Sequence, residues 1–280
     1  MGDIMRVFVL GLDGTDYYLA LKWNLRWILQ RTNGTFNIGK EYFGDIDEPY
    51  SPVIWTSIIT GKKPSEHKIK DWWIYNGILN KLRFLPIIRH IKGKRKILWR
   101  LGIKPHAPNR KDLKCDTIFD IVKPSVAVYV PGYNDTTEFR MKLWSCRLKG
   151  INDYINAIWE IHEERKRATF RALEENNDWK LFMTYFDLAD LMGHIFITQQ
   201  LKMMKVYFEL NRLTGKLYKY VTSLFDDVVF LVISDHGMTV SEDGVSGRHT
   251  CYAFWSLNID ENWKPKDFTH FFYKIQEWVK

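Results

Sequence analysis

The stretch Val228-Val-Phe-Leu-Val-Ile-Ser-Asp-His-Gly237 decides the fold class. A short apolar run that ends abruptly in polar residues and glycine is typical of a strand buried on both faces of a parallel sheet. A second stretch, Val7-Phe-Val-Leu-Gly-Leu-Asp-Gly14, has the same form. An aspartate follows the apolar run in both, and open α/β sheets bind their ligands beyond the carboxyl ends of strands. The two stretches predict a mostly parallel sheet with a functional site at that edge.

The rest of the chain alternates between the two kinds of element. The patterns predict further strands at 126–130, 181–186 and 252–257, and helices at about 16–31, 51–60, 117–122, 151–177, 197–223 and 267–279. Ser51-Pro52 is a favoured helix start, and Gly61 suits a helix end. This order predicts an α/β fold with a doubly wound, mostly parallel sheet sandwiched by helices. We expect residues 1–280 to form one domain.

Residues 62–115 differ in character and are expected to form a small basic and aromatic cap inserted into that domain. Between 81 and 104 there are nine Lys or Arg and no acid, interleaved with apolar side chains. Three interpretations of 81–104 stay open. The stretch is a solvated surface, it steers a polyanionic substrate by its field, or it contacts anionic lipid.

Composition excludes several classes of protein. The net charge is +8, with 46% hydrophobic and 26% charged residues, which is an ordinary globular mixture and excludes disorder and collagen-like repeats. The three cysteines form no C-x-x-C pair, so a disulfide framework and a thiolate zinc site are not expected. Without a signal peptide or a long apolar run, we expect a cytoplasmic protein, peripheral to the membrane if 81–104 binds lipid. No nucleic-acid motif is present, and no pattern indicates an oligomeric state.

Carboxylates and imidazoles gather at the predicted strand ends. Asp13 follows the first strand, and Asp235 and His236 follow the clearest one. Asp190 and His194 are four residues apart, within reach of one ion. His249 lies in a glycine-containing loop that can fold back toward His236. Each residue alone has a plain structural explanation, such as a turn or a helix cap. Three Asp and three His together suit two zinc-like ions with oxygen and nitrogen ligands, and manganese is the alternative.

Ser51 is the candidate nucleophile. As the expected cap of its helix it lies at the positive end of the helix dipole, which favours an anionic oxygen. A bound metal ion lowers the pKa of such an oxygen further. The alternatives are that Ser51 only caps the helix, or that Thr56 or Ser57, deeper in the helix, supplies the hydroxyl.

Five segments resemble the alkaline phosphatase superfamily, nearest its type I phosphodiesterase/nucleotide pyrophosphatase branch. They are VFVLGLDG (7–14), SPVIWTSIITGKKPSEH (51–67), DLADLMGH (187–194), LVISDHGM (231–238) and GRH (247–249). Family members carry Thr or Ser ten residues before the glycine of the T-G pair, and counting back from Gly61 gives Ser51. Lys68 departs from the glycine that many relatives have after the histidine.

The resemblance implies a role for each matched position. It implies that Asp13, Asp235 and His236 hold one ion together with the Ser51 oxygen. It implies that Asp190, His194 and His249 hold the other. His67 matches a family histidine that packs after the helix and is not assigned to metal.

The implied function is metal-dependent hydrolysis of a small phosphate ester, with phosphodiesterase chemistry, a serine nucleophile and two divalent ions. The alternatives within the superfamily are a phosphomonoesterase and a phosphotransferase or mutase. An alternative of another class is a non-enzymatic basic module that binds a membrane or a polyanion. The competent residue types at all seven matched positions favour the enzyme.

Overall fold

The computed structural model describes residues 5–44, 47–75, 77, 80, 98 and 101–280. The basic stretch predicted at 81–104 lies outside the described residues, apart from 98 and 101–104. The structural role of the proposed cap at 62–115 therefore stays a prediction.

Six strands of the described chain form the central sheet, in the order β2-β8-β5-β1-β4-β3. They are β1 (Arg6–Leu12), β2 (Thr32–Asn37), β3 (Ser125–Val128), β4 (Leu181–Phe186), β5 (Val228–Ser234) and β8 (Tyr252–Leu257). β1 pairs in parallel with both β4 and β5, and β3 pairs in parallel with β4. Only β8 runs against its neighbours β5 and β2. The predicted mostly parallel α/β sheet is confirmed.

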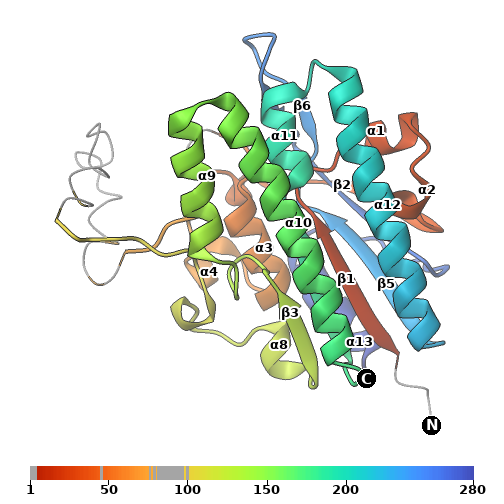
Figure 1. Ribbon diagram of the computed structural model, residues 1–280. Coiled ribbons are helices and arrows are strands. Elements are labelled where there is room, and N and C mark those ends of the chain that lie inside the picture. Colours follow the sequence, from red (N-terminus) through yellow and green to blue (C-terminus); the bar gives the residue numbers. More distant parts are fainter. Residues whose placement is uncertain (1–4, 45–46, 76, 78–79, 81–97, 99–100) are drawn as a thin grey trace.

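Helices cover both faces of this sheet (Figure 1). One face packs against α3 (Ser51–Thr60), α8 (Ile118–Ile121) and α13 (Thr269–Trp278). The other packs against α1 (Tyr17–Lys22), α2 (Arg26–Leu29), α10 (Ile151–Glu175), α11 (Leu188–Phe196) and α12 (Gln200–Leu224). Side chains alternate along β1, so that Val7 and Val9 enter the first core and Phe8 and Leu10 the second. Full burial on both faces explains the unbroken apolar runs of β1 and β5.

The remaining elements of the described residues are short or lie at the rim. They are α4 (Pro64–His67), α9 (Thr137–Lys149), the hairpin strands β6 (Met238–Val240) and β7 (Gly247–His249), and two 3-10 turns at Lys40–Tyr42 and Arg110–Asp112. Cys115, Cys146 and Cys251 are free thiols. No helix in the described part of the chain combines the length and apolar character needed to cross a membrane.

Two sequence expectations about elements are wrong. The single helix expected at 16–31 is two helices, α1 and α2, because Asn24 between them adopts a left-handed φ of 49°. Ser51 is the first residue of α3, and Tyr50 takes the cap position without a side-chain hydrogen bond. Gly61 ends this helix in the left-handed conformation, as expected.

Several elements were not predicted from the sequence, for different physical reasons. Strand β2 buries only Phe36, since it forms the edge of the sheet. Helix α9 buries only Arg140 and Leu143, so it has no apolar stripe that a helical period would reveal. Helix α11 is buried along most of its length and follows β4 directly, so its sequence reads as a continuation of the strand.

Candidate metal centre and nucleophile

The structure brings all seven predicted site residues together at the carboxyl edge of the sheet. Asp13 follows β1, and Asp235 and His236 follow β5. Asp190 and His194 lie on α11, His249 ends β7, and Ser51 begins α3. Helix α11 and the β6–β7 hairpin lie at the end of the molecule toward which β1 runs (Figure 1). The strand-end rule that suggested Asp13, Asp235 and His236 is thus the reason these three residues meet.

Asp13, Asp235 and His236 form the deeper group, which is buried completely. Nε2 of His236 lies 3.4 Å from Oδ1 of Asp13 and 3.5 Å from Oδ2 of Asp235. The Ser51 Oγ lies 3.3 Å from Oδ1 of Asp13 and 3.2 Å from Nε2 of His236. The candidate nucleophile therefore faces this group directly.

Asp190, His194 and His249 form the outer group. Nε2 of His194 and Nε2 of His249 lie 3.3 Å and 3.1 Å from Oδ1 of Asp190, and 3.1 Å from each other. The two groups adjoin, because Nε2 of His236 is 3.9 Å from the same Asp190 oxygen. The rings of His236 and His249 stack with centroids 3.6 Å apart. The His194 side chain is 41% exposed, so the site opens to solvent on the side of the outer group.

The three histidines share one tautomer, and it suits metal binding. Nδ1 of His194 bonds to the Gly247 carbonyl, Nδ1 of His236 to the Gly237 carbonyl and Nδ1 of His249 to the Pro49 carbonyl. A carbonyl only accepts, so each Nδ1 carries the hydrogen. Each Nε2 lone pair of the neutral rings then points into the site, as in metal-ligating histidines oriented by a carbonyl.

The carboxylates also fit cations. Oδ1 of Asp190 and Oδ2 of Asp235 are buried and accept no hydrogen bond of good geometry, although imidazole nitrogens lie 3.1–3.5 Å away. An unpartnered buried carboxylate oxygen is costly unless a cation neutralises it. One such oxygen belongs to each group. Among the described residues, two clusters here have ligand atoms within 4.8 Å of one another: Asp13, Asp235 and His236, and Asp190, His236 and His249. His236 is thus shared, and His194 lies outside both clusters. The donor set of oxygen and imidazole nitrogen suits two divalent ions such as zinc.

The pKa values of Asp235, His194 and Asp190 are shifted by burial and by their neighbours. Burial, reinforced by Asp13, raises the pKa of Asp235 well above its usual range. Burial lowers the pKa of His194, but Asp190 outweighs this effect and raises it to about 9. Burial opposes a low pKa for Asp190, and the charge of His194 overcomes it, so this pKa lies well below the usual range. Without cations, protons bind at these positions, and metal binding is expected to release them.

Two aromatic residues orient Asp13, and sequence reasoning missed both. The Tyr185 hydroxyl donates to Oδ2 of Asp13 over 2.5 Å, and Nε1 of Trp55 donates to the same oxygen over 3.1 Å. Oδ1 is left to face Ser51 and His236. Tyr185 lies on β4 and Trp55 on α3, and no spacing in the sequence connects either residue to Asp13.

The competing hydroxyls are engaged elsewhere. Oγ1 of Thr56 donates to the Pro52 carbonyl over 2.7 Å, as helix-interior threonines commonly do. Oγ of Ser57 is hydrogen-bonded to Nε2 of His67 over 3.0 Å. His67 is buried behind α3 and is not among the candidate metal clusters of the described residues. Of the three hydroxyls, only that of Ser51 faces the two groups.

A third cluster of potential ligands lies apart from this site, on α10 and α12. It consists of His162, Glu163 and Glu209. Glu209 already bonds to Lys166 over 2.8 Å and also to Arg212, so its charge is neutralised by protein cations. Burial raises the pKa of Glu209, but these partners and His162 together lower it below the usual range. The cluster is an ion-pair network.

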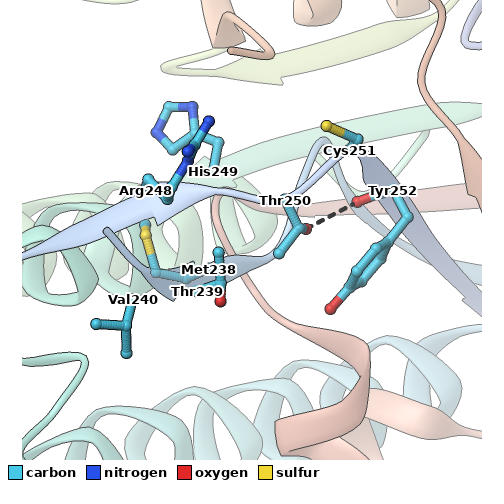
Figure 2. Close-up of a pocket in the computed structure, with 8 residues that line it drawn as sticks. All are labelled: Met238, Thr239, Val240, Arg248, His249, Thr250, Cys251 and Tyr252. Atoms are coloured by element: carbon cyan, nitrogen blue, oxygen red, sulfur yellow. Dashed lines mark hydrogen bonds between the residues drawn. The ribbon is translucent and has the colours of Figure 1, made fainter. Parts of the chain in front are cut away.

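A cavity of about 510 Å³ lies beside the outer group. Figure 2 shows that the β6–β7 hairpin and the start of β8 line it, with His249 and Arg248 on one side and Tyr252 on the other. Because His249 belongs both to the outer group and to this wall, the cavity adjoins the outer group. It has room for part of a small ligand.

Comparisons with known proteins identify the family of the chain. The model of the family described as type I phosphodiesterase / nucleotide pyrophosphatase matches residues 46–250. No curated protein sequence matches the chain. Among solved structures, murine ectonucleotide pyrophosphatase / phosphodiesterase 5 is 18% identical with a TM-score of 0.47, covering 85% of this chain and 59% of its own. It is also known in complex with AMP, as an inactive variant. Phosphonoacetate hydrolase from Sinorhizobium meliloti 1021 is 15% identical with a TM-score of 0.49, covering 86% of this chain and 58% of its own.

The chain thus spans less than two thirds of the length of these solved relatives. The family model covers most of the chain and all the site residues except Asp13. The predicted resemblance is confirmed: this chain belongs to the type I phosphodiesterase / nucleotide pyrophosphatase family.

Proposed function

We propose that this chain hydrolyses phosphate diesters, with Ser51 as the nucleophile and two divalent cations held by the two ligand groups. Asp13, Asp235 and His236 would hold one cation, and Asp190, His194 and His249 the other. Zinc fits the mixed oxygen and nitrogen donors best, and manganese is the second choice. The observation that carries the proposal is the position of the Ser51 hydroxyl, 3.2–3.3 Å from ligand atoms of the deeper group.

When bound, the cations would lower the pKa of the serine hydroxyl and neutralise charge on the phosphoryl oxygens. The chain itself supplies position. Ser51 is held at the first turn of α3, and its hydroxyl proton is directed at Oδ1 of Asp13. Tyr185 and Trp55 occupy the other Asp13 oxygen, so that carboxylate cannot rotate away.

The reaction would proceed in two displacements. In the first, a bond forms between Ser51 Oγ and phosphorus, and the bond from phosphorus to one ester oxygen breaks. The released alcohol takes up a proton. In the second, water attacks phosphorus, the bond to Ser51 breaks, and the serine hydroxyl regains its proton. The products are an alcohol and a phosphate monoester.

The substrate class proposed is a diester or pyrophosphate with a nucleotide-like group. The family description and the AMP bound to the murine relative support this choice. The open cavity beside His249 supports a substrate that extends beyond the phosphoryl group.

The direct test is hydrolysis of bis-p-nitrophenyl phosphate by the metal-stripped chain and by the same chain reloaded with zinc or manganese. p-Nitrophenyl phosphate, a monoester, is the comparison substrate. We expect nitrophenol release that depends on metal, is abolished by chelator and is faster with the diester. Faster release from the monoester would instead assign a phosphomonoesterase. No release by folded, metal-loaded protein would contradict the proposal.

A further inference from the structure

A cluster of four buried charges lies beneath the candidate centre. It consists of Arg140 on α9, Arg165 on α10, Asp187 at the start of α11, and Asp135 in the loop after β3. Helix α10, which carries Arg165, lies between α9 and α11 (Figure 1). Side chains of Arg165 and Asp135 are each 1% exposed. Two positive and two negative charges balance, so the cluster can stay ionised away from water.

The guanidinium of Arg165 connects three segments at the carboxyl edge of the sheet. Its NH1 donates to the Tyr129 carbonyl over 3.2 Å and to the Tyr185 carbonyl over 3.5 Å. Its NH2 donates to Asp135 over 3.0 Å and to Asp187 over 3.4 Å. A planar fork with fixed donor directions is required for such a set, and a lysine ammonium cannot reproduce it.

The fork bonds to one residue beside each ligand group. Tyr185 bonds to Arg165 through its carbonyl and to Asp13, in the deeper group, through its hydroxyl. Asp187 precedes α11, whose first turn carries Asp190 of the outer group. The Asp187 side chain does not cap its own helix and is instead turned toward the arginines. Arg165 thus contacts the support of both groups.

Arg140 completes the cluster from the other side. Its Nε and NH2 both bond to Oδ2 of Asp135, over 3.0 and 2.8 Å, and its NH1 lies 3.6 Å from Asp187. The ring of Trp72 covers the guanidinium at 3.5 Å. Both carboxylates are therefore shared between the two arginines. Asp187 is held between Arg140 of α9 and Arg165 of α10.

We infer that Arg165 is a positioning residue that sets the separation of the two metal-ligand groups. The inference rests on the proposed two-cation function. A buried ion cluster is a poor device for stability alone, because well-packed apolar residues of similar volume often do as well or better. It is a good device for direction, because each bond fixes an angle as well as a distance. The separation of the groups decides whether two cations can act on one phosphoryl group.

The test is metal binding, measured on folded protein without substrate. Chelator-stripped protein is titrated with Mn²⁺ at low temperature, and free Mn²⁺ is followed by electron paramagnetic resonance. The variants are Arg165→Lys, Arg165→Met and Asp187→Asn. The matched control is Thr169→Val, one turn further along α10. Its fully buried hydroxyl donates to the Arg165 backbone carbonyl over 2.8 Å and bonds to Thr184 over 2.7 Å, but does not touch the guanidinium. Thermal unfolding is recorded for every variant.

We expect two Mn²⁺ ions per wild-type chain. Changes to residues that orient metal ligands weaken metal binding by about 10- to 100-fold. Both Arg165 variants should lower the affinity for both ions by at least about tenfold. The conservative change Arg165→Lys should therefore not preserve binding. Asp187→Asn should weaken the binding of the outer ion more than that of the deeper ion, because Asp187 lies beside the outer group only. Thr169→Val should lower the unfolding temperature and leave both affinities unchanged.

Three results would overturn the inference. Unchanged affinities in a folded Arg165→Lys protein would show that the fork does not position the ligands. An equal loss in Thr169→Val would assign the effect to general loosening of α10. A wild-type chain that binds no Mn²⁺ or Zn²⁺ would overturn the proposed function as well. The other two results would overturn only the role of Arg165, because the wild-type chain would still bind metal. If Arg165→Met does not fold, Arg165→Lys and Asp187→Asn decide the question.

Discussion

Tyr185 donates its phenolic hydrogen to Oδ2 of Asp13 over 2.5 Å, from a strand that is the parallel neighbour of the one Asp13 follows. Burial, reinforced by Asp13, raises the pKa of Tyr185 well above its usual range, so the phenol is a donor at every physiological pH. Trp55 donates to the same oxygen. The Asp13 carboxylate therefore has one oxygen fixed by the protein and one directed at the candidate centre.

Tyr185→Phe is predicted to weaken metal binding without unfolding the chain. It removes one hydroxyl and keeps the ring that packs against Trp55 at 5.2 Å. Loss of a bond that orients a ligand weakens metal affinity by about 10- to 100-fold. Zn²⁺ titration of the metal-stripped protein measures the change. Tyr207→Phe, at another fully buried tyrosine, is the control, and an equal loss there would contradict a specific role for Tyr185.

Ser51→Ala is predicted to retain bound metal and to lose nearly all turnover of bis-p-nitrophenyl phosphate. The change removes the attacking oxygen, while the six proposed metal ligands stay in place. Ser57→Ala is the matched control, because Ser57 is a buried serine on the same helix whose hydroxyl bonds to His67. We expect the control to lose stability and keep activity. Full activity in Ser51→Ala would show that another nucleophile acts, such as Thr56 or water.

The positions of Asp13, Asp235 and His236 can be predicted from the sequence because they depend on strand ends. An apolar run fixes where β1 and β5 lie, and the residue after each run must then appear at the carboxyl edge. Asp13, Asp235 and His236 follow from this rule alone. His249 follows only from the possibility that its loop folds back, and the β6–β7 hairpin is the element that brings it there.

The supporting residues could not be predicted in this way. Tyr185 and Trp55 are aromatic residues in apolar elements, where core packing is the ordinary explanation. Arg165 interrupts the apolar face of α10 but has no partner nearby in sequence, since Asp135, Tyr129 and Asp187 come from other elements. A charged residue on a buried helix face is the only signal available, and it does not identify its partners.

Gly14→Ala is predicted to disturb the outer group through its backbone. Gly14 has a φ of 68°, and a Cβ there would lie 2.6–2.8 Å from the backbone and Cβ of Asp190. A left-handed alanine costs about 1 kcal/mol of stability by backbone strain alone. Helix α11 would also have to shift, so we expect the variant to bind metal more weakly. Gly244→Ala is the control, with a φ of 71° and open space around it. Equal metal affinity in both variants would contradict the prediction.

His67 predicts a pH-dependent loss of stability in acid. Its Nδ1 accepts from the Ile69 backbone, so Nε2 carries the hydrogen and the ring is neutral. Burial lowers its pKa to about 4. Above pH 6.5 the ring is neutral in both the folded and unfolded states and has no effect. As pH falls from 6.5 to 4 only the unfolded chain takes up the proton, so the folded state loses up to about 3 kcal/mol.

Urea unfolding of wild type and of His67→Gln, both with chelator, measures this loss. We expect the difference between their unfolding free energies to change by about 3 kcal/mol between pH 7 and pH 4. The other histidines titrate equally in both proteins and cancel. A difference that does not vary with pH would show that His67 is not held neutral.

Asp235→Asn is predicted to have opposite effects on the metal-free and the metal-loaded chain. Without metal, Asp235 is fully buried beside Asp13, one of its oxygens has no partner, and its pKa is raised by burial and by Asp13. A raised carboxyl pKa means that, above pH 3.8, ionisation favours the unfolded chain. Asparagine removes the charge and keeps the oxygen that accepts from the Gly14 backbone.

In chelator at pH 7 we therefore expect the unfolding free energy of Asp235→Asn to exceed that of wild type by on the order of 1–3 kcal/mol. The variant should then unfold at a higher temperature. In excess Zn²⁺ the order should reverse, because a ligand that binds only the folded state stabilises wild type and the variant has lost a charged ligand. Thermal unfolding of both proteins, with chelator and with Zn²⁺, checks both signs. A Zn²⁺-induced shift as large in Asp235→Asn as in wild type would contradict its assignment as a ligand, whatever happens in chelator.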